Sequence, residues 1–176
     1  DVTEHKEYTL RQGTLEIARN SPNNTQITLY VSEDKSLIPP TIVQHIDRVS
    51  RALSNLTKQS KGRISFESVF LKPDTDFAES AELVGIRKIP MSSGDSLYFG
   101  AVFKSGDKHL VTSYFDVNRA TSLEYDLALQ LSNLSRDKTP QIGILSSVLK
   151  PANAETPHPG LSILEELKSQ YDVSII

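Results

Sequence analysis

Two hydrophobic periodicities alternate along the chain. Strands are predicted where apolar residues alternate with polar ones or form a short continuous run, at about residues 26–31, 63–71, 97–103 and 109–115. Helices are predicted where apolar residues are spaced three and four apart, at 41–60, 76–84 and 121–136, with a further short helix at 9–18. The chain is therefore expected to alternate strands and helices over most of its length.

The helices carry the sharpest local signals. The helix at 41–60 presents one apolar stripe to a core: Ile42, Ile46, Val49, Leu53 and Leu56. Capping boxes, in which a Thr and a Glu or Gln three residues later satisfy free N–H groups, are predicted at Thr9 and Gln12, Thr41 and Gln44, and Thr121 and Glu124. In the helix at 76–84, Phe77, Ala81 and Val84 are expected to share the buried face, with Gly85 as the left-handed residue after it.

The order of these elements predicts the fold. Strand, helix, strand, helix, strand, strand and helix follow one another from about residue 26 to 136, which is a thioredoxin-like α/β order. We expect a mixed four-stranded sheet with helices on both faces. Pro90 stands where thioredoxin-like folds often carry a cis-proline, which makes it the candidate for a cis peptide bond.

The pattern starts afresh after Pro140. A strand at 141–147, a Pro-rich loop at 150–160, a helix at 161–170 and a strand at 171–176 resemble the opening of a second α/β domain. The chain ends on the apolar run at 171–176, so we expect a piece of a longer protein. The predicted organisation is an N-terminal extension with a short helix (1–25), a thioredoxin-like domain (26–138) and the beginning of a truncated second domain (139–176).

Composition limits the chemistry. The 176 residues include no Cys, so the predicted thioredoxin-like domain lacks redox cysteines, and disulfides and thiolate metal sites are excluded. A formal net charge of -3 gives no strong basic field, so nucleic acid is not an expected partner. No apolar run is long enough to cross a bilayer, so membrane attachment would require segments outside this sequence.

Motifs for cofactors are equally scarce. The four histidines, at positions 5, 45, 109 and 158, show no metal-binding spacing, and no Gly-rich phosphate loop or GxSxG elbow occurs. No metal, cofactor or catalytic residue is therefore expected. A scaffold of this order without its dithiol is better interpreted as a binding surface.

The segment at 123–127 supplies the few candidate binding residues. Glu124 and Asp126 flank Tyr125, but successive helical residues point about 100° apart, so the carboxylates are not expected to converge as a general acid and base. Helix capping and the helix dipole account for both acids. Glu124, Tyr125, Asp126 and the nearby Arg119 remain candidates for ligand or partner contact.

Several short stretches together resemble a known family. They are Asp1-Val2-Thr3-Glu4 with Tyr8-Thr9-Leu10, Ile27 to Ser32, Ser60 to Ile64, Tyr98-Phe99-Gly100, Leu123-Glu124-Tyr125-Asp126-Leu127 and Ile142 to Ser146. In this order they are similar to GldG-like proteins, the auxiliary components of ABC transport systems linked to gliding motility. The Leu-Glu-Tyr-Asp-Leu run is the most specific element. The chain departs from the family at Ala120, where an acidic residue is common beside the retained Arg119.

The resemblance implies an extracytoplasmic fragment, on the periplasmic side of a bacterial inner membrane and anchored by transmembrane helices outside this sequence. Its partners would be the ABC permease and ATPase of the same system, and its role would be non-catalytic binding and assembly. An alternative is a small-molecule or carbohydrate binder, or a hydrolase, that uses a pocket between the two α/β units. Polar candidates for that seam are Glu124, Tyr125, Asp126 and Ser146.

Overall fold

The structure, a computed structural model, describes residues 10–136. The chain divides into two units, Asp1–Leu134 and Ser135–Ile176, and the described elements belong to the first, apart from the last residue of the final helix. The strands and helix expected within 141–176 lie outside the described residues, as do Ser146 and Thr9.

The described helices and strands follow the predicted order. The helices are α1 (Gln12–Arg19), α2 (Pro40–Gln59), α3 (Asp76–Val84) and α4 (Leu123–Ser135), with short 3-10 helices η1 (Lys35–Leu37) and η2 (Val117–Ser122). The strands are β1 (Thr25–Ser32), β2 (Ile64–Leu71), β3 (Ile89–Pro90), β4 (Ser96–Leu97), β5 (Phe99–Ser105) and β6 (Lys108–Thr112).

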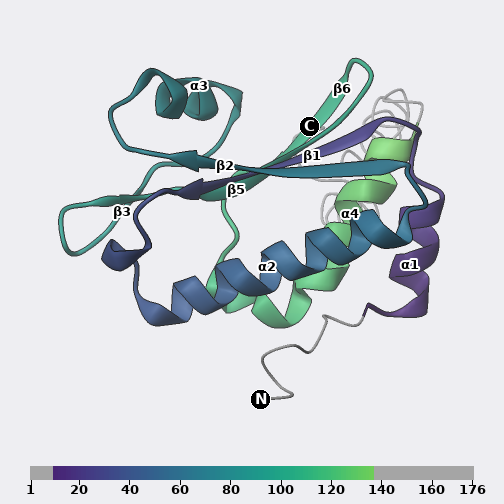
Figure 1. Ribbon diagram of the computed structural model, residues 1–176, viewed down its shortest axis with the longest axis horizontal. Helices are drawn as coiled ribbons and strands as arrows, with labels where there is room; N and C mark the ends of the chain where they lie inside the picture. The colour runs from purple at the N-terminus through teal and green to yellow at the C-terminus, as the bar shows by residue number, and fades with distance from the viewer. Residues whose placement is uncertain (1–9, 137–176) are drawn as a thin grey trace, which may run out of the picture. The chain divides into compact units, whose positions relative to one another are not determined.

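The main sheet is mixed, as the thioredoxin-like order predicts. Its four strands lie in the order β2-β1-β5-β6. β1 is parallel to β2 and antiparallel to β5, and β6 is antiparallel to β5 (Figure 1). The parallel pair needs a crossover, which α2 supplies, whereas β5 and β6 form a hairpin. The expected mixed α/β fold is therefore confirmed.

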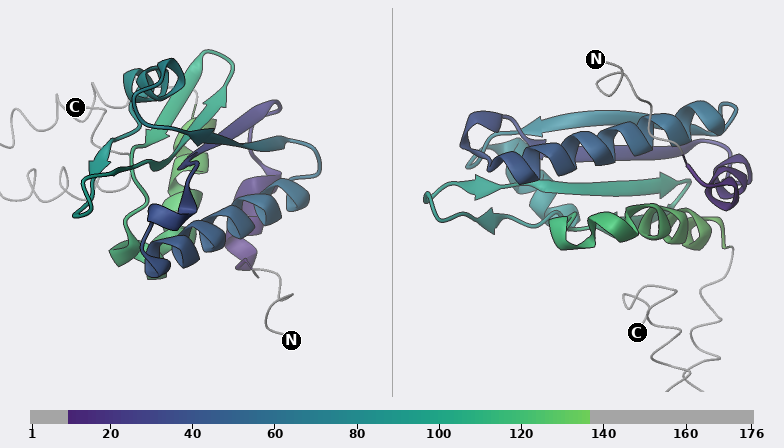
Figure 2. Two further views of the ribbon diagram at one scale, coloured as in Figure 1. Left: turned by 60° about the vertical axis from the view of Figure 1, so that its left-hand side comes forward. Right: turned by 90° about the horizontal axis from the view of Figure 1, so that it is seen from below.

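Helices cover both faces of the sheet. α2 and α4 lie side by side across one face, and α3 lies on the other (Figure 2). The main core lies under α2 and α4 and includes the predicted stripe residues Ile46, Val49, Leu53 and Leu56, all at most 3 % exposed. The fold therefore rests on the amphipathic pattern that defined α2.

Two helix starts differ from the predicted capping boxes. α2 begins at Pro40, where proline is favoured because the first helical N–H has no acceptor, and its cap residue Pro39 contributes no side-chain bond. α1 begins at Gln12, and the side chain of its cap residue Arg11 likewise makes no capping hydrogen bond. The predicted capping box at Thr41 is therefore wrong: the helix begins one residue earlier, at Pro40, and Thr41 lies inside it.

The predicted face of α3 is only partly buried. Ala81 is buried together with Ala78, whereas Phe77 is 77 % and Val84 is 44 % exposed. The small alanines let the helix lie close to the sheet, in a second cluster with Leu71, Ile86 and Tyr98. Gly85 has φ 116° after the helix, as its sequence position predicts.

The apolar run at 97–103 is two strands rather than one. Ser32 interrupts it, because its Oγ accepts the Tyr98 N–H at 2.8 Å and its own N–H donates to the Tyr98 carbonyl at 3.0 Å. The chain before this point pairs in a separate two-stranded ribbon, in which Pro90 lies opposite Ser96. β6 ends at Thr112, earlier than predicted, although the Phe115 N–H still donates to the Phe99 carbonyl.

The expectation of a cis bond at Pro90 is wrong. No peptide bond among the described residues is cis, so the bond before Pro90 is trans. Pro90 is the last residue of β3, in the small ribbon and outside the four-stranded sheet. An extended backbone suits the fixed φ of proline, and the general preference for the trans isomer holds there.

Candidate functional site

The Leu-Glu-Tyr-Asp-Leu segment forms the first turn of α4, directly after η2. Leu123 and Leu127 are buried in the main core, at 2 % and 1 % exposed. The three residues between them occupy the remaining directions around the helix. The two leucines therefore fix the orientation of the polar candidates.

Arg119 and Asp126 form the strongest contact of this segment. The Arg119 Nε and Nη2 atoms donate to the two Asp126 carboxylate oxygens at 2.9 Å and 2.7 Å, which is a bidentate pair. The hydrogen bonds and charge of Asp126 raise the pKa of Arg119. The pair joins η2 to the first turn of α4, so Arg119 has an acidic partner in α4 although its neighbour in η2 is Ala120.

Glu124 forms a hydrogen bond with a residue far from it in the sequence. Its carboxylate accepts the backbone N–H of Arg11, the cap residue of α1. A carboxylate at a helix start also compensates the positive end of the helix dipole. Thr121 lies inside η2, so the predicted Thr121 box is wrong and Glu124 caps α1 rather than its own helix.

Tyr125 differs from its neighbours in exposure. Its side chain is 54 % exposed, between two carboxylates that are both engaged. The structure thus brings Arg119, Glu124, Tyr125 and Asp126 close together, but it uses the three charged groups to hold η2, α1 and α4. As predicted, the two carboxylates do not converge on a common point.

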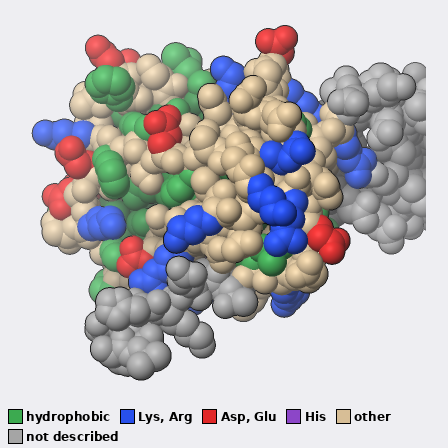
Figure 3. Space-filling model, turned by 45° about the vertical axis from the view of Figure 1, so that its right-hand side comes forward, with side chains coloured by type: hydrophobic (Ala, Val, Ile, Leu, Met, Phe, Trp, Pro, Cys, Tyr) green, Lys and Arg blue, Asp and Glu red, His purple; other side chains and the backbone are tan. Residues whose placement is uncertain are grey.

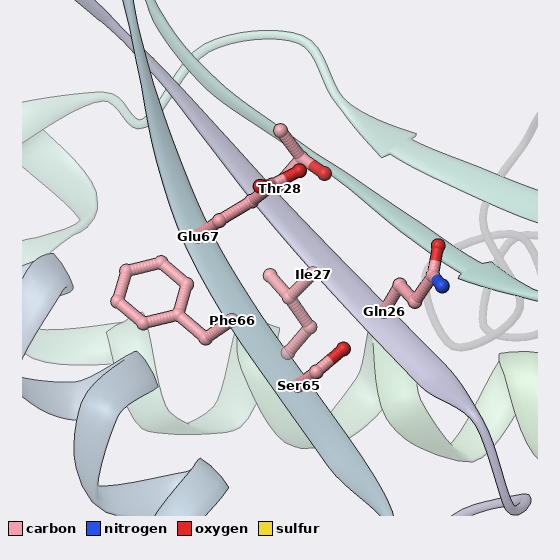
Figure 4. Close-up of a pocket in the computed structure, with 6 residues that line it drawn as sticks. All are labelled: Gln26, Ile27, Thr28, Ser65, Phe66 and Glu67. Carbon is pink, nitrogen blue, oxygen red and sulfur yellow. The ribbon is translucent and has the colours of Figure 1, made fainter.

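A shallow hollow of about 240 Å³ lies across the parallel pair β1 and β2. It is lined by Gln26, Ile27, Thr28, Ser65, Phe66 and Glu67 (Figure 4). Glu67 is its one acidic residue, and no histidine, lysine or arginine lines it. Sequence reasoning did not single out this place, although the alternation along both strands turns Thr28, Ser65 and Glu67 away from the main core. The hollow can accept hydrogen-bonding groups but lacks a base and acid pair.

Metal ligands are not grouped in the part of the chain that the structure describes. No three His, Asp or Glu residues between 10 and 136 lie close enough to hold an ion. Within the same residues, no helix has both the length and the apolar character needed to cross a membrane.

On one face of the surface, Lys and Arg side chains gather near the middle and hydrophobic side chains gather toward one side (Figure 3).

Tyr98 attaches α3 to the sheet. Its hydroxyl donates to the Glu82 carboxylate at 2.7 Å. Burial, and then the Glu82 carboxylate, raise the pKa of Tyr98 far above its ordinary value. Tyr98 is therefore a permanent donor at physiological pH and serves the packing of α3.

His45 of α2 is a buried titratable group away from these residues. Its side chain is 4 % exposed, and its ring meets Phe99 edge-on at a centroid distance of 5.5 Å. Its Nδ1 atom has no hydrogen-bond partner among the residues the structure describes. Burial, followed by the charge of Arg48, lowers the pKa of His45, while the Asp116 backbone and carboxylate act in the opposite direction.

Acidification is expected to destabilise the protein through His45. The unfolded chain keeps a histidine pKa of about 6.5 and binds the proton first, because the folded state has the lower pKa. The stability contributed by neutral His45 is complete above about pH 6.5 and is lost as the pH falls toward the folded-state pKa. Urea unfolding between about pH 7.5 and 5 measures this loss.

The control for this prediction is the exposed His109. The His109→Asn variant should keep the pH dependence, whereas His45→Asn should reduce it. Equal pH dependence in His45→Asn and the wild type would contradict the role assigned to His45.

Comparison with known proteins places the chain in a family without adding a site. A family described as a domain of unknown function, DUF7088, matches residues 4–104, which is more than half of the chain. The match extends from before α1 to near the end of β5 and stops short of Arg119 and the segment at 123–127. No curated protein and no solved structure matches the chain. The chain belongs to the DUF7088 family.

Proposed function

We propose that this chain is a non-catalytic, extracytoplasmic binding and assembly module of an ABC-type transport system of the gliding-motility auxiliary kind. Its partners are the permease and ATPase subunits of that system, and segments outside this sequence anchor it in the bacterial inner membrane. The ordered set of short motifs shared with GldG-like proteins supports this proposal.

The observation that carries the binding role is the outer face of α3, defined by Phe77, Leu83 and Val84. Their side chains are 77 %, 88 % and 44 % exposed, on a helix whose alanines face the sheet. Large apolar side chains that are grouped on an exposed surface are typical of protein interaction surfaces. The charged candidates at Arg119, Glu124 and Asp126 support a non-catalytic role, because each is occupied by a contact within the chain.

Co-purification tests the proposal. The full-length protein, expressed with its cognate permease and ATPase, is expected to retain both subunits in mild detergent. Exchanging both Phe77 and Leu83 for serine should reduce the recovered permease several-fold, because the outer face of α3 loses its apolar side chains. Exposed sites of this kind change the free energy of unfolding by only about 0.5 kcal/mol, so the variant is expected to fold.

The matched control is Leu37→Ser in η1, since Leu37 is also exposed, at 47 %. This variant should retain the permease at the wild-type level. A wild-type protein that recovers neither subunit would contradict the proposal. Equal losses in the α3 variant and the Leu37 variant would show that the outer face of α3 has no specific role.

A further inference from the structure

Within residues 10–136, no strand of the sheet pairs with the outer edge of β2. The Thr25 N–H donates to the Arg63 carbonyl and the Glu33 N–H donates to the Leu71 carbonyl, which sets the phase of the parallel pair. In a parallel ladder, the residues that bond to the neighbour alternate with those that do not. Odd-numbered residues of β2 therefore bond to β1. The N–H and C=O groups of Phe66, Ser68 and Phe70 point away from the sheet.

The sequence and register of β2 itself contain none of the usual features that protect an edge strand from a further strand. β2 has eight residues with neither lysine nor proline, and its register with β1 runs without a bulge from Ile64 to Leu71. Its one charged residue is Glu67, and Phe70 is 57 % exposed. The connection from β2 to β5 runs through α3, which lies on the face of the sheet opposite α2 (Figure 1). The opposite edge strand, β6, has five residues and begins with a lysine.

The sequence of the edge is self-complementary. In Phe66-Glu67-Ser68-Val69-Phe70, an aromatic residue stands two positions on either side of Ser68. We propose that β2 pairs antiparallel with β2 of a second copy of this chain, about a two-fold axis at Ser68. Phe66 of each copy then lies opposite Phe70 of the other, which gives two aromatic pairs. Aromatic pairs directly across a ladder are stabilising.

The axis at Ser68 also agrees with the backbone. Directly opposed residues that exchange both hydrogen bonds recur at every second position of an antiparallel ladder. With this axis, those positions are Phe66, Ser68 and Phe70, the three whose groups point outward. Glu67 lies opposite Val69 of the other copy, so the two carboxylates do not face one another directly.

The interface is of the weak, reversible class. One pair of strands with two aromatic pairs buries less than the roughly 1,200–2,000 Å² of stable complexes. We therefore expect a concentration-dependent dimer with a dissociation constant on the order of micromolar. This dimer does not involve the outer face of α3. The pairing of β2 and the binding role of α3 can therefore be tested separately, and one can be correct when the other is wrong.

Sedimentation equilibrium of the 176-residue chain tests the pairing. The wild type should dimerise, and Ser68→Pro should weaken the dimer at least about tenfold, because proline removes a donor at the axis. Proline is tolerated on an edge strand where the N–H faces solvent, so the monomer should keep its circular dichroism spectrum. Ser68→Lys, which places two charges at the axis, should act in the same direction, while His109→Lys on β6 should have no effect.

Disulfide trapping tests the register. The chain has no cysteine, so a single introduced thiol reports only on its own position. Under mild oxidation Ser68→Cys should give a covalent dimer, because opposed Cα atoms about 5.5 Å apart suit a disulfide. Ser65→Cys, at another exposed serine on the same strand, should not, because its two copies would be roughly 20 Å apart.

Several results would overturn the proposal. These are a wild-type chain that stays monomeric at high micromolar concentration, a dimer unaffected by both Ser68→Pro and Ser68→Lys, and cross-linking that is equal for Ser65→Cys and Ser68→Cys. A dimer that is lost in Phe77→Ser but kept in Ser68→Pro would assign self-association to α3 instead.

Discussion

Replacing Phe99 with alanine is expected to lower the free energy of unfolding by about 3–5 kcal/mol. Phe99 of β5 is fully buried. Its ring meets His45 at 5.5 Å, Phe115 at 5.1 Å and Tyr114 at 6.4 Å between centroids. Truncation removes these contacts and leaves a cavity between the sheet and α2. Equilibrium unfolding in urea measures the change.

Phe77→Ala is the matched control, because Phe77 is the same residue type at an exposed position. It should change the free energy of unfolding by no more than about 0.5 kcal/mol. Comparable losses for Phe99→Ala and Phe77→Ala would contradict the placement of the core under α2 and α4.

The second large effect is expected at Gly100, where β5 passes close to the end of β6. A Cβ atom built on Gly100 would lie 2.5 Å from the Thr112 carbonyl oxygen and 2.7 Å from that of Ser113. Both are backbone atoms, so relief requires the strands to separate. Gly100→Ala should therefore lower the free energy of unfolding by about 3 kcal/mol or more, measured by the same urea titration.

Gly13 provides the opposite control. It lies in α1, and a Cβ there would meet nothing within 4 Å. Alanine at this helical position should stabilise the protein by up to about 1 kcal/mol. A neutral Gly100→Ala variant would mean that β5 and β6 are further apart than described.

Periodicity was enough to predict the main architecture. Alternation around Leu29 identified a strand, and the stripe through Val49 and Leu53 identified the long helix, because each places one continuous apolar face on a common core. The order of the elements then left few ways to connect a mixed sheet. The strands, the long helix and their order each depend on many residues, so one atypical side chain does not change the prediction.

The errors arose where one contact between distant residues decides the outcome. The Ser32 hydroxyl accepts the Tyr98 N–H and so divides the apolar run into two strands. The sequence of the run contains no sign of this contact. α3 buries Ala78 beside Ala81 and leaves Phe77 exposed, because the smaller side chain allows close approach to the sheet. Periodicity alone does not indicate whether a helix buries its small side chains, which pack closely on a sheet, or its large ones.

Sequence reasoning named Arg119, Glu124, Tyr125 and Asp126 as candidates, but it did not indicate the contacts that they make. The sequence indicated that Glu124 and Asp126 diverge, which the structure confirms. It could not indicate that Glu124 caps a helix more than a hundred residues earlier in the chain, or that Asp126 pairs with Arg119. Such partners depend on tertiary proximity, and the spacing of residues along one helix contains no information about it.

The central position of β5 has a consequence for protein synthesis. Its apolar sequence is of the kind that aggregates when its backbone is exposed. β1, which pairs with one edge, leaves the ribosome well before β5, and β6, which pairs with the other edge, follows after a two-residue turn. This apolar strand therefore emerges after one of its partners has been synthesised and just before the other, which shortens its exposure to other nascent chains and to chaperones.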